Sequence, residues 1–416
     1  MNGNRVRLPQ LLWHDDDELE IEFPSSWDVT VCRMNGSDRP GINEKRIREA
    51  FANPIGTAPI RELARGKKNV AILFDDMTRP TRVAEIVPYV LEELKAAGVE
   101  DGGIRFIAAV GAHGAHDRLD FIRKLGEPVV GRYPIYNHNP YENCVYIGET
   151  SRGTPVSINS DFMSCDFKIG IGSILPHHLM GFSGGGKIIM PGIASIDTIA
   201  HNHGAFIANA FTRGEDPGIG AGRLEDNLLR LDLAEAAKMA GLDVKIDAVI
   251  NARARTTDLF IGDPAGAHLQ GARLAREVYA TKPVENPDIA VMNTYCRASE
   301  AVLVLPFLPH FFKESAGDLV IICNVPEGQV PHYLVRSFGK ACGGRVWFAP
   351  TVMPRNVENF HFLSPYQDIT AADWLAPADS ITWTRTWPEV LERLTARHGD
   401  KARVAVVPDA TMQYFV

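Results

Sequence analysis

Residues 70–80 read VAILFDDMTRP, an apolar run that ends in two aspartates, a threonine, an arginine and a proline. Residues 105–113 (RFIAAVGAH) and 167–178 (FKIGIGSILPHH) follow the same plan, with histidine after the apolar run. Short apolar runs bounded by glycine, proline or aspartate predict buried β-strands. Further runs at 288–292 and 319–323 predict two more strands.

Two amphipathic helices are predicted from apolar residues that recur with a helical period. The apolar face of the first consists of Ile86, Val87, Val90, Leu91 and Leu94. That of the second consists of Leu224, Leu228, Leu231 and Ala234. Gly98 and Gly241 follow them where C-terminal caps belong. Apolar strands alternating with such helices indicate an α/β protein with mainly parallel sheets flanked by helices, whose ligands sit beyond the carboxyl ends of the strands.

The chain of 416 residues is long enough for two domains. The stretch 280–287 (ATKPVENP), with two prolines, separates a helical pattern from a new strand. We therefore expect an N-terminal domain at 1–280 and a C-terminal α/β domain at 287–416. Residues 1–45 predict β-hairpins and loops.

Composition excludes several classes of function. The net charge is −8 and no Lys/Arg cluster occurs, so nucleic acid is not an expected partner. The longest uncharged apolar run, 301–312, contains two prolines and is too short to cross a membrane. Since no secretion leader opens the chain either, we expect a cytoplasmic protein without membrane contact. The six cysteines include no C-x-x-C pair, which argues against a zinc ribbon or an iron–sulfur cluster.

Residues 177–203 (HHLMGFSGGGKIIMPGIASIDTIAHNH) place two histidine pairs around a glycine-rich loop that ends in a lysine. The loop at 181–187 matches the start of a Walker A motif, but Ile188 stands where that motif needs Ser or Thr. A P-loop NTPase is therefore a poor fit. The glycines indicate close backbone approach to a ligand, and Lys187 is available as a nucleophilic amine. The histidines lack zincin spacing, yet four imidazoles around one lysine favour a metal or cofactor site.

His113 and His116 directly follow the predicted strand at 105–110. A histidine in a glycine turn at a strand end is well placed as a general acid–base. The alternative is the start of a helix that Asp117 caps.

Residues 75–80 predict a strand-to-helix turn in which Pro80 occupies the first helical position. Arg79 would then lie at the positive end of a helix, where it binds carboxylate or phosphate. The paired aspartates would hold ribose hydroxyls or orient Arg79. The alternative is a capping aspartate beside a surface arginine.

Together these motifs resemble the nickel-pincer nucleotide-dependent lactate racemase family, a group of 2-hydroxy acid racemases and epimerases. The family's D-x-T-R-P motif matches residues 76–80, and its G-[TL]-H turn matches 111–113. Its H-x-x-x-G-x-S-G-G-x-K signature matches 177–187, and its downstream metal-binding histidine falls on His203. The resemblance covers most of the first two thirds of the chain.

The resemblance implies a role for each matching residue. Lys187 would carry the cofactor, a pyridinium-3-thioamide-5-thiocarboxylate mononucleotide, through a thioamide bond, and His203 would bind its nickel. His113 and His177 would be the two acid–base residues, and Arg79 would bind the substrate. The further cofactor-binding positions that it implies are Asp76, Thr78, Gly184 and Gly185.

The implied reaction is inversion of the C2 centre of a 2-hydroxy acid. Hydride leaves C2 for the cofactor while a histidine takes the hydroxyl proton, and hydride returns to the other face of the planar 2-keto acid. The N-terminal domain would bind the cofactor and carry out catalysis, and the C-terminal domain would close over the substrate in an interdomain cleft. The implied partners are a small 2-hydroxy acid and the proteins that build the cofactor; a homo-oligomer is left open.

The sequence also departs from the lactate enzyme. Residues 293–306 (NTYCRASEAVLVLP) contain no lysine where that enzyme offers a substrate-binding lysine, and Arg297 is the candidate replacement. Gly186 precedes Lys187 where that enzyme has arginine. We therefore expect a substrate other than lactate. Two alternatives are a zinc- or nickel-dependent hydrolase that uses the same histidines without an organic cofactor, and a nucleotide-binding sensor whose loop cradles a phosphate.

Overall fold

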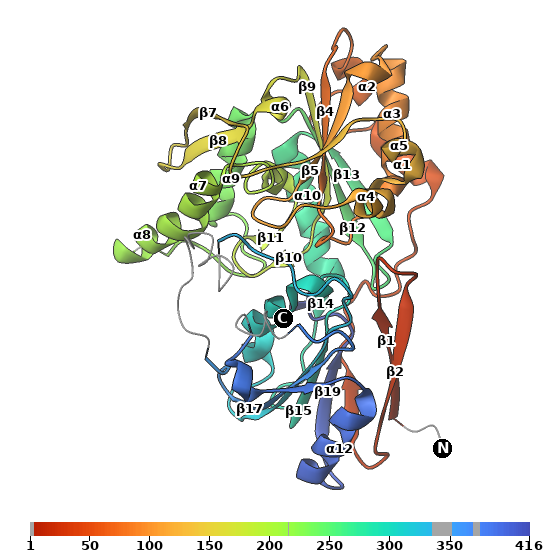
Figure 1. The fold of residues 1–416 in the computed structure, drawn as a ribbon, viewed down its shortest axis with the longest axis vertical. Coiled ribbons are helices and arrows are strands. Elements are labelled where there is room, and N and C mark those ends of the chain that lie inside the picture. The colour runs from red at the N-terminus through yellow and green to blue at the C-terminus, as the bar shows by residue number, and fades with distance from the viewer. Residues whose placement is uncertain (1–3, 215, 335–351, 369–374) are drawn as a thin grey trace. The chain divides into compact units, whose positions relative to one another are not determined.

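The computed structural model describes residues 4–214, 216–334, 352–368 and 375–416. The chain divides into two compact units. Of the described residues, 38–276 and 331–334 form unit 2, while 4–37, 277–330 and those from 352 onward form unit 1. Figure 1 labels the helices and strands of both.

Unit 2 contains a six-stranded sheet in the order β13-β12-β9-β4-β5-β6. Its strands are β4 (Val70–Asp75), β5 (Ile104–Ala109), β6 (Ile135–Asn137), β9 (Phe167–Ser173), β12 (Val244–Ile250) and β13 (Thr256–Gly262). Neighbouring strands are parallel except for β12 and β13, which pair antiparallel. Every residue of β4 and β12 is buried, as expected for central strands covered on both faces.

Helices cover both faces of this sheet (Figure 1). Because side chains alternate along a strand, Val70 and Ile72 of β4 belong to one core while Ala71 and Leu73 belong to the other. The first core also contains residues of α1 (Glu44–Ala52), α2 (Ile60–Leu63), α3 (Val87–Ala96), α4 (Arg118–Leu125) and α5 (Glu127–Val130). The second contains residues of α6 (Ser160–Met163), α7 (Ile196–Ala200), α8 (Phe206–Thr212) and α9 (Leu228–Met239).

Shorter elements complete unit 2. Two antiparallel hairpins are formed by β7 (Cys144–Glu149) with β8 (Pro155–Asn159), and by β10 (Pro176–His177) with β11 (Gly181–Phe182). Helix α10 (Pro264–Val278) follows β13 and ends at the beginning of unit 1. The single-turn helices are η1 (Val83–Glu85), η2 (Asp101–Gly103), η3 (Gly185–Ile188) and the π-helical η4 (His201–Ala205).

Unit 1 contains a second six-stranded sheet, entirely parallel, in the order β18-β17-β16-β15-β19-β3. Its strands are β3 (Asp28–Val31), β15 (Ile289–Asn293), β16 (Gly317–Ile322), β17 (Val357–Leu363), β18 (Ile381–Thr384) and β19 (Arg403–Val407). The other elements are the hairpin β1 (Asn4–Gln10) and β2 (Asp17–Phe23), the pair β14 (Ala280–Thr281) and β20 (Tyr414–Phe415), η5 (Ala298–His310), η7 (Ala378–Ser380) and α12 (Trp387–His398). Val390 and Leu394 of α12 pack in one core with Ile289 and Val320 of the sheet.

The predicted fold class is confirmed: both sheets are largely parallel and flanked by helices. All five strands predicted from apolar runs are present, as β4, β5, β9, β15 and β16. The assignment of the N-terminal segment differs. Residues 4–37 were expected in the first domain, but β3 pairs with β19, so this segment belongs to unit 1.

The apolar face predicted for the second helix is wrong. The apolar residues that α9 buries are Leu229, Leu233, Ala236 and Ala237. Leu231 is 37% exposed, and the helix also buries Arg230 and Asp232. Two polar residues on the buried face disguised the true helical period. Gly98 and Gly241 do follow α3 and α9 with positive φ, as C-terminal caps require.

Two expectations from composition, about membrane spans and about the cysteines, can be compared with the described residues. Among them, no helix is long and apolar enough to span a membrane. Cys32, Cys144, Cys165, Cys296 and Cys323 are free thiols. Cys342 lies outside the described residues.

Candidate active site

A buried ion pair fixes the loop that follows β4. Lys124 Nζ lies 2.8 Å from Asp75 Oδ1, and it also donates to the backbone oxygens of Asp76 (3.0 Å) and Arg79 (2.7 Å). Thr81 Oγ1 donates to the other oxygen of Asp75. Burial lowers the pKa of Lys124, although Asp75 opposes that shift. These bonds hold residues 76–79 as a loop.

The predicted helix start at Pro80 is therefore wrong. Helix α3 begins at Val87, with Pro88 in its first turn, and only the short η1 precedes it. The backbone oxygens of Asp76 and Arg79 bind the Lys124 amine, so they do not begin a helical ladder. Arg79 thus lies in a loop and does not gain the field of a helix N-terminus.

Asp76 orients His113. Its Oδ2 lies 2.5 Å from Nδ1 of His113, while its Oδ1 accepts bonds from Thr78 N (3.0 Å) and Thr78 Oγ1 (2.5 Å). Burial by itself raises the pKa of Asp76. The charges of His113, Arg79 and His116 lower it by more, so the net pKa lies well below the usual range. The ionised carboxylate favours a proton on His113 Nδ1, which leaves Nε2 to exchange protons.

Thr78 connects this pair to Arg79. The Arg79 guanidinium donates to Thr78 O (3.1 Å) and to Thr78 Oγ1 (2.7 Å), and that same hydroxyl donates to Asp76. Asp76 and Thr78 had been expected to bind the cofactor. That expectation stays a prediction, and their hydrogen bonds also orient His113 and Arg79.

His116 takes part in a different set of contacts. Its Nε2 accepts from Met77 N (3.2 Å), and its Nδ1 lies 3.4 Å from Asp120. Asp117 caps α4 by accepting from the amides of Leu119 and Asp120. The helix-start alternative is therefore correct for His116 and Asp117, whereas His113 is the histidine that pairs with a buried carboxylate.

His177 is buried at the end of β10. Its Nδ1 accepts bonds from the backbone N–H groups of Leu179 and Met180, both at 3.2 Å. A ring nitrogen that accepts from N–H groups carries no proton, so the neutral ring has its proton on Nε2. His178 stacks on this ring, with centroids 4.9 Å apart and an interplanar angle of 10°.

The glycines of the loop at 181–187 pack against protein. A Cβ on Gly184 would lie 2.9 Å from Asp247 Oδ1, and one on Gly185 would lie 2.8 Å from His268 Cγ. Both glycines have positive φ, and Gly185 N donates to Asp247 Oδ2 at 2.8 Å. The close backbone approach expected here is therefore an approach to side chains of the same unit. Contacts within the protein therefore explain why residues 184 and 185 are glycine. Because the N–H group of Gly185 already donates to Asp247, it is not available to bind a phosphate in the nucleotide-sensor alternative.

A buried charged network supports this loop, and it was not anticipated from the sequence. Lys245 and Asp247 of β12 pair at 2.6 Å with almost no exposure. Arg230 of α9 donates to Phe182 O (2.8 Å) and contacts the ring of His268. Burial lowers the pKa of Arg230 to about 10, so it is still charged near neutral pH. The residues lie within apolar strands and helices, where periodicity does not distinguish a buried ion pair from core.

His203 lies in the π-helical turn η4. Its Nδ1 atom is buried without a hydrogen-bond partner among the described residues. Burial lowers the pKa of His203 to about 3, and the charges of Lys187, His178 and His113 lower it as well. The ring is therefore neutral near pH 7, as metal binding requires. Because these charges act on His203, the structure brings the lysine, the metal candidate and the acid–base candidate into one electrostatic neighbourhood.

His332 adjoins His113 and was not anticipated from the sequence. Tyr333 N donates to Ala112 O at 2.8 Å, and His113 and His332 form an antiparallel bridge. Their rings meet edge to face, with centroids 5.3 Å apart. The two segments are far apart in the chain, so no local motif indicated their contact.

Arg297, the candidate substrate residue from the second half of the chain, belongs to unit 1, whereas the other predicted site residues belong to unit 2. Its side chain is buried, with 2% exposure, and its backbone N–H donates to Thr411 Oγ1 at 3.2 Å.

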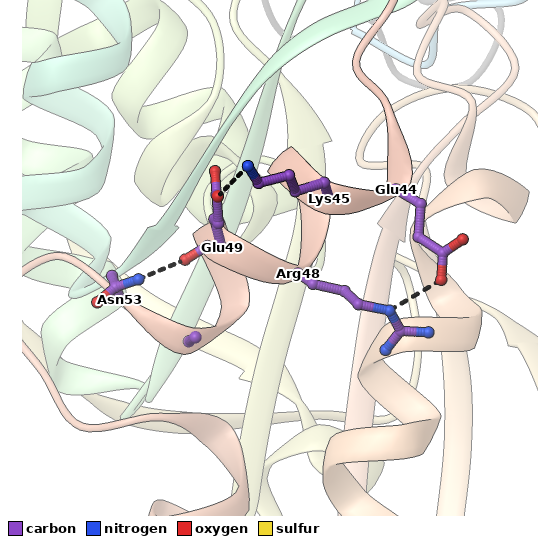
Figure 2. Close-up of a pocket in the computed structure, with 6 residues that line it drawn as sticks. Glu44, Lys45, Arg48, Glu49 and Asn53 are labelled. Carbon is purple, nitrogen blue, oxygen red and sulfur yellow. Dashed lines mark hydrogen bonds and ion pairs between the residues drawn. The ribbon is translucent and has the colours of Figure 1, made fainter.

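One surface pocket lies along α1 and is separate from these residues. It is lined by Glu44, Lys45, Arg48, Glu49, Ala52 and Asn53. Figure 2 shows that its charged side chains pair with one another, with Arg48 bonded to Glu44 and Lys45 paired with Glu49. No predicted site residue lines it. Within the described part of the chain, no three His, Cys, Asp or Glu side chains are grouped as metal ligands. The described residues therefore offer no set of ligands for the metal of the hydrolase alternative.

Comparison with known proteins finds similarity to lactate racemases. The lactate racemase N-terminal domain matches residues 14–213. A lactate racemase from Thermoanaerobacterium thermosaccharolyticum is 33% identical over 281 residues, which cover 66% of this chain and just under two thirds (64%) of that relative. A lactate racemase from Lactiplantibacillus plantarum is 27% identical over 391 residues, which cover 88% of this chain and 89% of that one.

Solved structures show the same fold. The lactate racemase apoprotein from T. thermosaccharolyticum has a TM-score of 0.73 at 22% identity, over 99% of this chain and 100% of that chain. A protein from Thermotoga maritima has a TM-score of 0.65 at 16% identity, over 92% and 99%. The relatives are racemases by name, and the solved structures share the fold of this chain. By sequence, the chain is similar to the lactate racemase family.

Proposed function

We propose that this protein is a racemase or epimerase that inverts the C2 centre of a 2-hydroxy acid, with a nickel-pincer nucleotide attached to Lys187. One observation carries the proposal. An imidazole oriented by a buried carboxylate, His113 with Asp76, acts electrostatically on the same buried histidine, His203, as Lys187 does. A proton-transfer group, a nucleophilic amine and a neutral metal ligand are the three protein groups that this chemistry needs.

The residues fit the cofactor. His203 presents a buried, neutral ring, which is the form in which imidazole binds a metal. Lys187 is half-buried at the end of the glycine loop and would form the thioamide bond. When bound, such a cofactor supplies reversible acceptance of hydride from C2. The proteins that build it would be partners of this chain.

His113 would exchange the hydroxyl proton. With Nδ1 bonded to Asp76, its Nε2 would accept that proton as hydride departs, and the carboxylate would stabilise the imidazolium that results. When the 2-keto acid is reduced on its other face, the histidine that then faces the oxygen at C2 would return a proton to it. Arg79, held by Thr78, would bind the substrate carboxylate with its planar guanidinium.

His177 would start in the complementary state, with its proton on Nε2. It would donate a hydrogen bond to the oxygen at C2 while His113 accepts, which suits a reaction that needs an acid and a base at the same pH. To accept a proton itself, Nδ1 has to release the N–H groups of Leu179 and Met180. Each of these N–H groups left without an acceptor costs about 1–3 kcal/mol, so the bonds favour His177 as the proton donor.

We further propose a substrate other than lactate. The relatives named lactate racemase are 27–33% identical to this chain, and residues 293–306 carry Arg297 in place of the expected lysine. A guanidinium binds a carboxylate through two parallel hydrogen bonds, whereas an ammonium acts as a point charge. The change therefore favours an acid with a differently placed carboxylate.

The test uses enantiopure 2-hydroxy acids that carry deuterium at C2. The holoenzyme, produced together with the cofactor-building proteins, is expected to invert one of these acids in ordinary water and to keep the deuterium at C2, because the same hydride returns. Inversion with loss of deuterium to solvent would mean direct deprotonation and would contradict the proposed mechanism.

A further inference from the structure

Asp232 of α9 is a fully buried carboxylate that binds three side chains. It accepts hydrogen bonds from Thr150 Oγ1 (2.5 Å), Thr154 Oγ1 (2.8 Å) and Asn202 Nδ2 (2.6 Å). Its exposure is 0%, and every one of these donors is buried. Thr150 Oγ1 already accepts from Thr154 N, so its hydrogen is directed at Asp232. Burying a carboxylate among neutral donors costs free energy that an apolar side chain would not, which suggests a purpose other than stability.

The three donors come from two segments. Thr150 and Thr154 form the turn of the hairpin β7–β8, whereas Asn202 lies in η4 between His201 and His203. Thr154 Oγ1 also lies 3.3 Å from His201 Nδ1, which gives the hairpin a second contact with η4. Asp232 therefore ties one short turn to another through α9.

The hydrogen bond from Asn202 to Asp232 holds η4 against α9. The turn is π-helical, a wider and less stable geometry than the α-helix, and such turns occur often at functional sites. Asn202 Oδ1 is buried without a hydrogen-bond partner in the described chain, so the bond to Asp232 is what orients this amide. The residue that follows Asn202 is His203.

We propose that Asp232 is a positioning residue for the metal ligand His203, acting through Asn202. This inference rests on the proposed function, in which His203 binds nickel. Hydrogen-bonded groups just outside the ligands of a metal orient those ligands, and their removal typically weakens metal binding by about 10- to 100-fold. Here Asn202 directly precedes the ligand His203 in the chain. Its hydrogen bond to Asp232 holds the backbone of η4, which carries His203.

The test compares Asp232→Asn with Glu235→Gln. Glu235 lies one turn further along α9 and accepts from Ser151 N (2.7 Å), Ser151 Oγ (2.6 Å) and Arg152 Nη1 (3.2 Å), all in the same hairpin turn. The control therefore removes an anchor of the hairpin and spares the tie to Asn202. Each variant is produced with the cofactor-building proteins, and the covalent adduct, the nickel per adduct and the rate of nickel loss to a chelator are measured.

We expect Asp232→Asn to keep the adduct on Lys187 and to lose nickel about 10- to 100-fold faster than wild type, while Glu235→Gln behaves as wild type. If Asp232→Asn does not fold, Asn202→Ala removes the same tie and leaves Asp232 bonded to both threonines. The exchanged pair Asn202→Asp with Asp232→Asn restores the hydrogen bond and is expected to recover nickel retention in part.

The outcomes separate the two claims. An adduct-bearing wild type, with Asp232→Asn and Asn202→Ala that both retain nickel as it does, would overturn the role of Asp232 and leave the proposed function standing. A wild type without adduct or nickel would overturn the proposed function, and the role of Asp232 with it.

Discussion

Asp76→Asn is expected to abolish most of the racemase activity while the protein stays folded. In the variant, the amide oxygen keeps the two bonds from Thr78, so the NH₂ group faces Nδ1 of His113. His113 then carries its proton on Nε2 and is no longer a base. The change removes both an ionic hydrogen bond and the productive tautomer.

The magnitude follows from those two losses. A hydrogen bond to a charged group contributes about 1.5–3 kcal/mol, which corresponds to about 10- to 150-fold in rate. A wrong tautomer in a carboxylate–histidine pair lowers kcat by about 10⁴-fold. We therefore expect kcat to fall by between about 100-fold and 10⁴-fold, with the adduct and nickel content unchanged.

The assay is the initial rate of inversion of an enantiopure 2-hydroxy acid, with kcat and KM measured separately. Asp120→Asn is the matched control, because Asp120 pairs with the neighbouring histidine His116 at 3.4 Å and with Arg123 at 3.3 Å. Its kcat is expected to stay within about threefold of wild type, a change below 1 kcal/mol. The reasoning is refuted if Asp76→Asn keeps more than half of the wild-type kcat.

Three further predictions concern other parts of unit 2. His177→Gln, whose amide keeps an N–H donor, is expected to retain at least about tenfold more kcat than His113→Gln, a difference of about 1.4 kcal/mol; equal losses would remove the distinction between donor and base. Burial lowers the pKa of His138 to about 4, so the unfolded state takes up a proton that the folded state does not, and stability falls as pH drops from about 6.5 toward 4. The loss is up to about 3 kcal/mol, and chemical denaturation at a series of pH values should show a flatter slope for His138→Gln than for wild type. Gly185→Ala, with φ +57° and a Cβ 2.8 Å from His268, is expected to lower the free energy of unfolding by about 2–4 kcal/mol. Gly98→Ala, whose Cβ meets nothing within 4 Å, is expected to lower it by about 1–2 kcal/mol. Similar denaturation midpoints for the two variants would contradict the packing explanation.

The sequence predicted the parts of the fold that local patterns encode. Strands β4, β5 and β9 are apolar runs with turn residues at their ends, so both the strands and the position of the polar motifs beyond them could be inferred. The pairing of β3 with β19 could not, because it joins segments at opposite ends of the chain. Long-range strand pairing depends on the packing of the whole unit and has no signature in either strand alone.

The site was predicted by residue type but not by partner. Asp76 and His113 were both candidates, yet their mutual bond follows from the parallel pairing of β4 with β5, which brings the two strand ends together. Arg230 and Asp232 escaped notice because they lie on the buried face of α9, where the periodicity of apolar residues led to the wrong face. Buried polar residues that support a site break the pattern that sequence analysis relies on.

The central claim is that Lys187 carries a nickel-containing cofactor. Intact-mass measurement with metal analysis, on wild type and Lys187→Ala each produced with the cofactor-building proteins, tests it most directly. The account predicts a covalent adduct and about one nickel per chain in wild type, with neither in the variant. A wild type without adduct or nickel, under conditions in which a known racemase of the family is loaded, would contradict it.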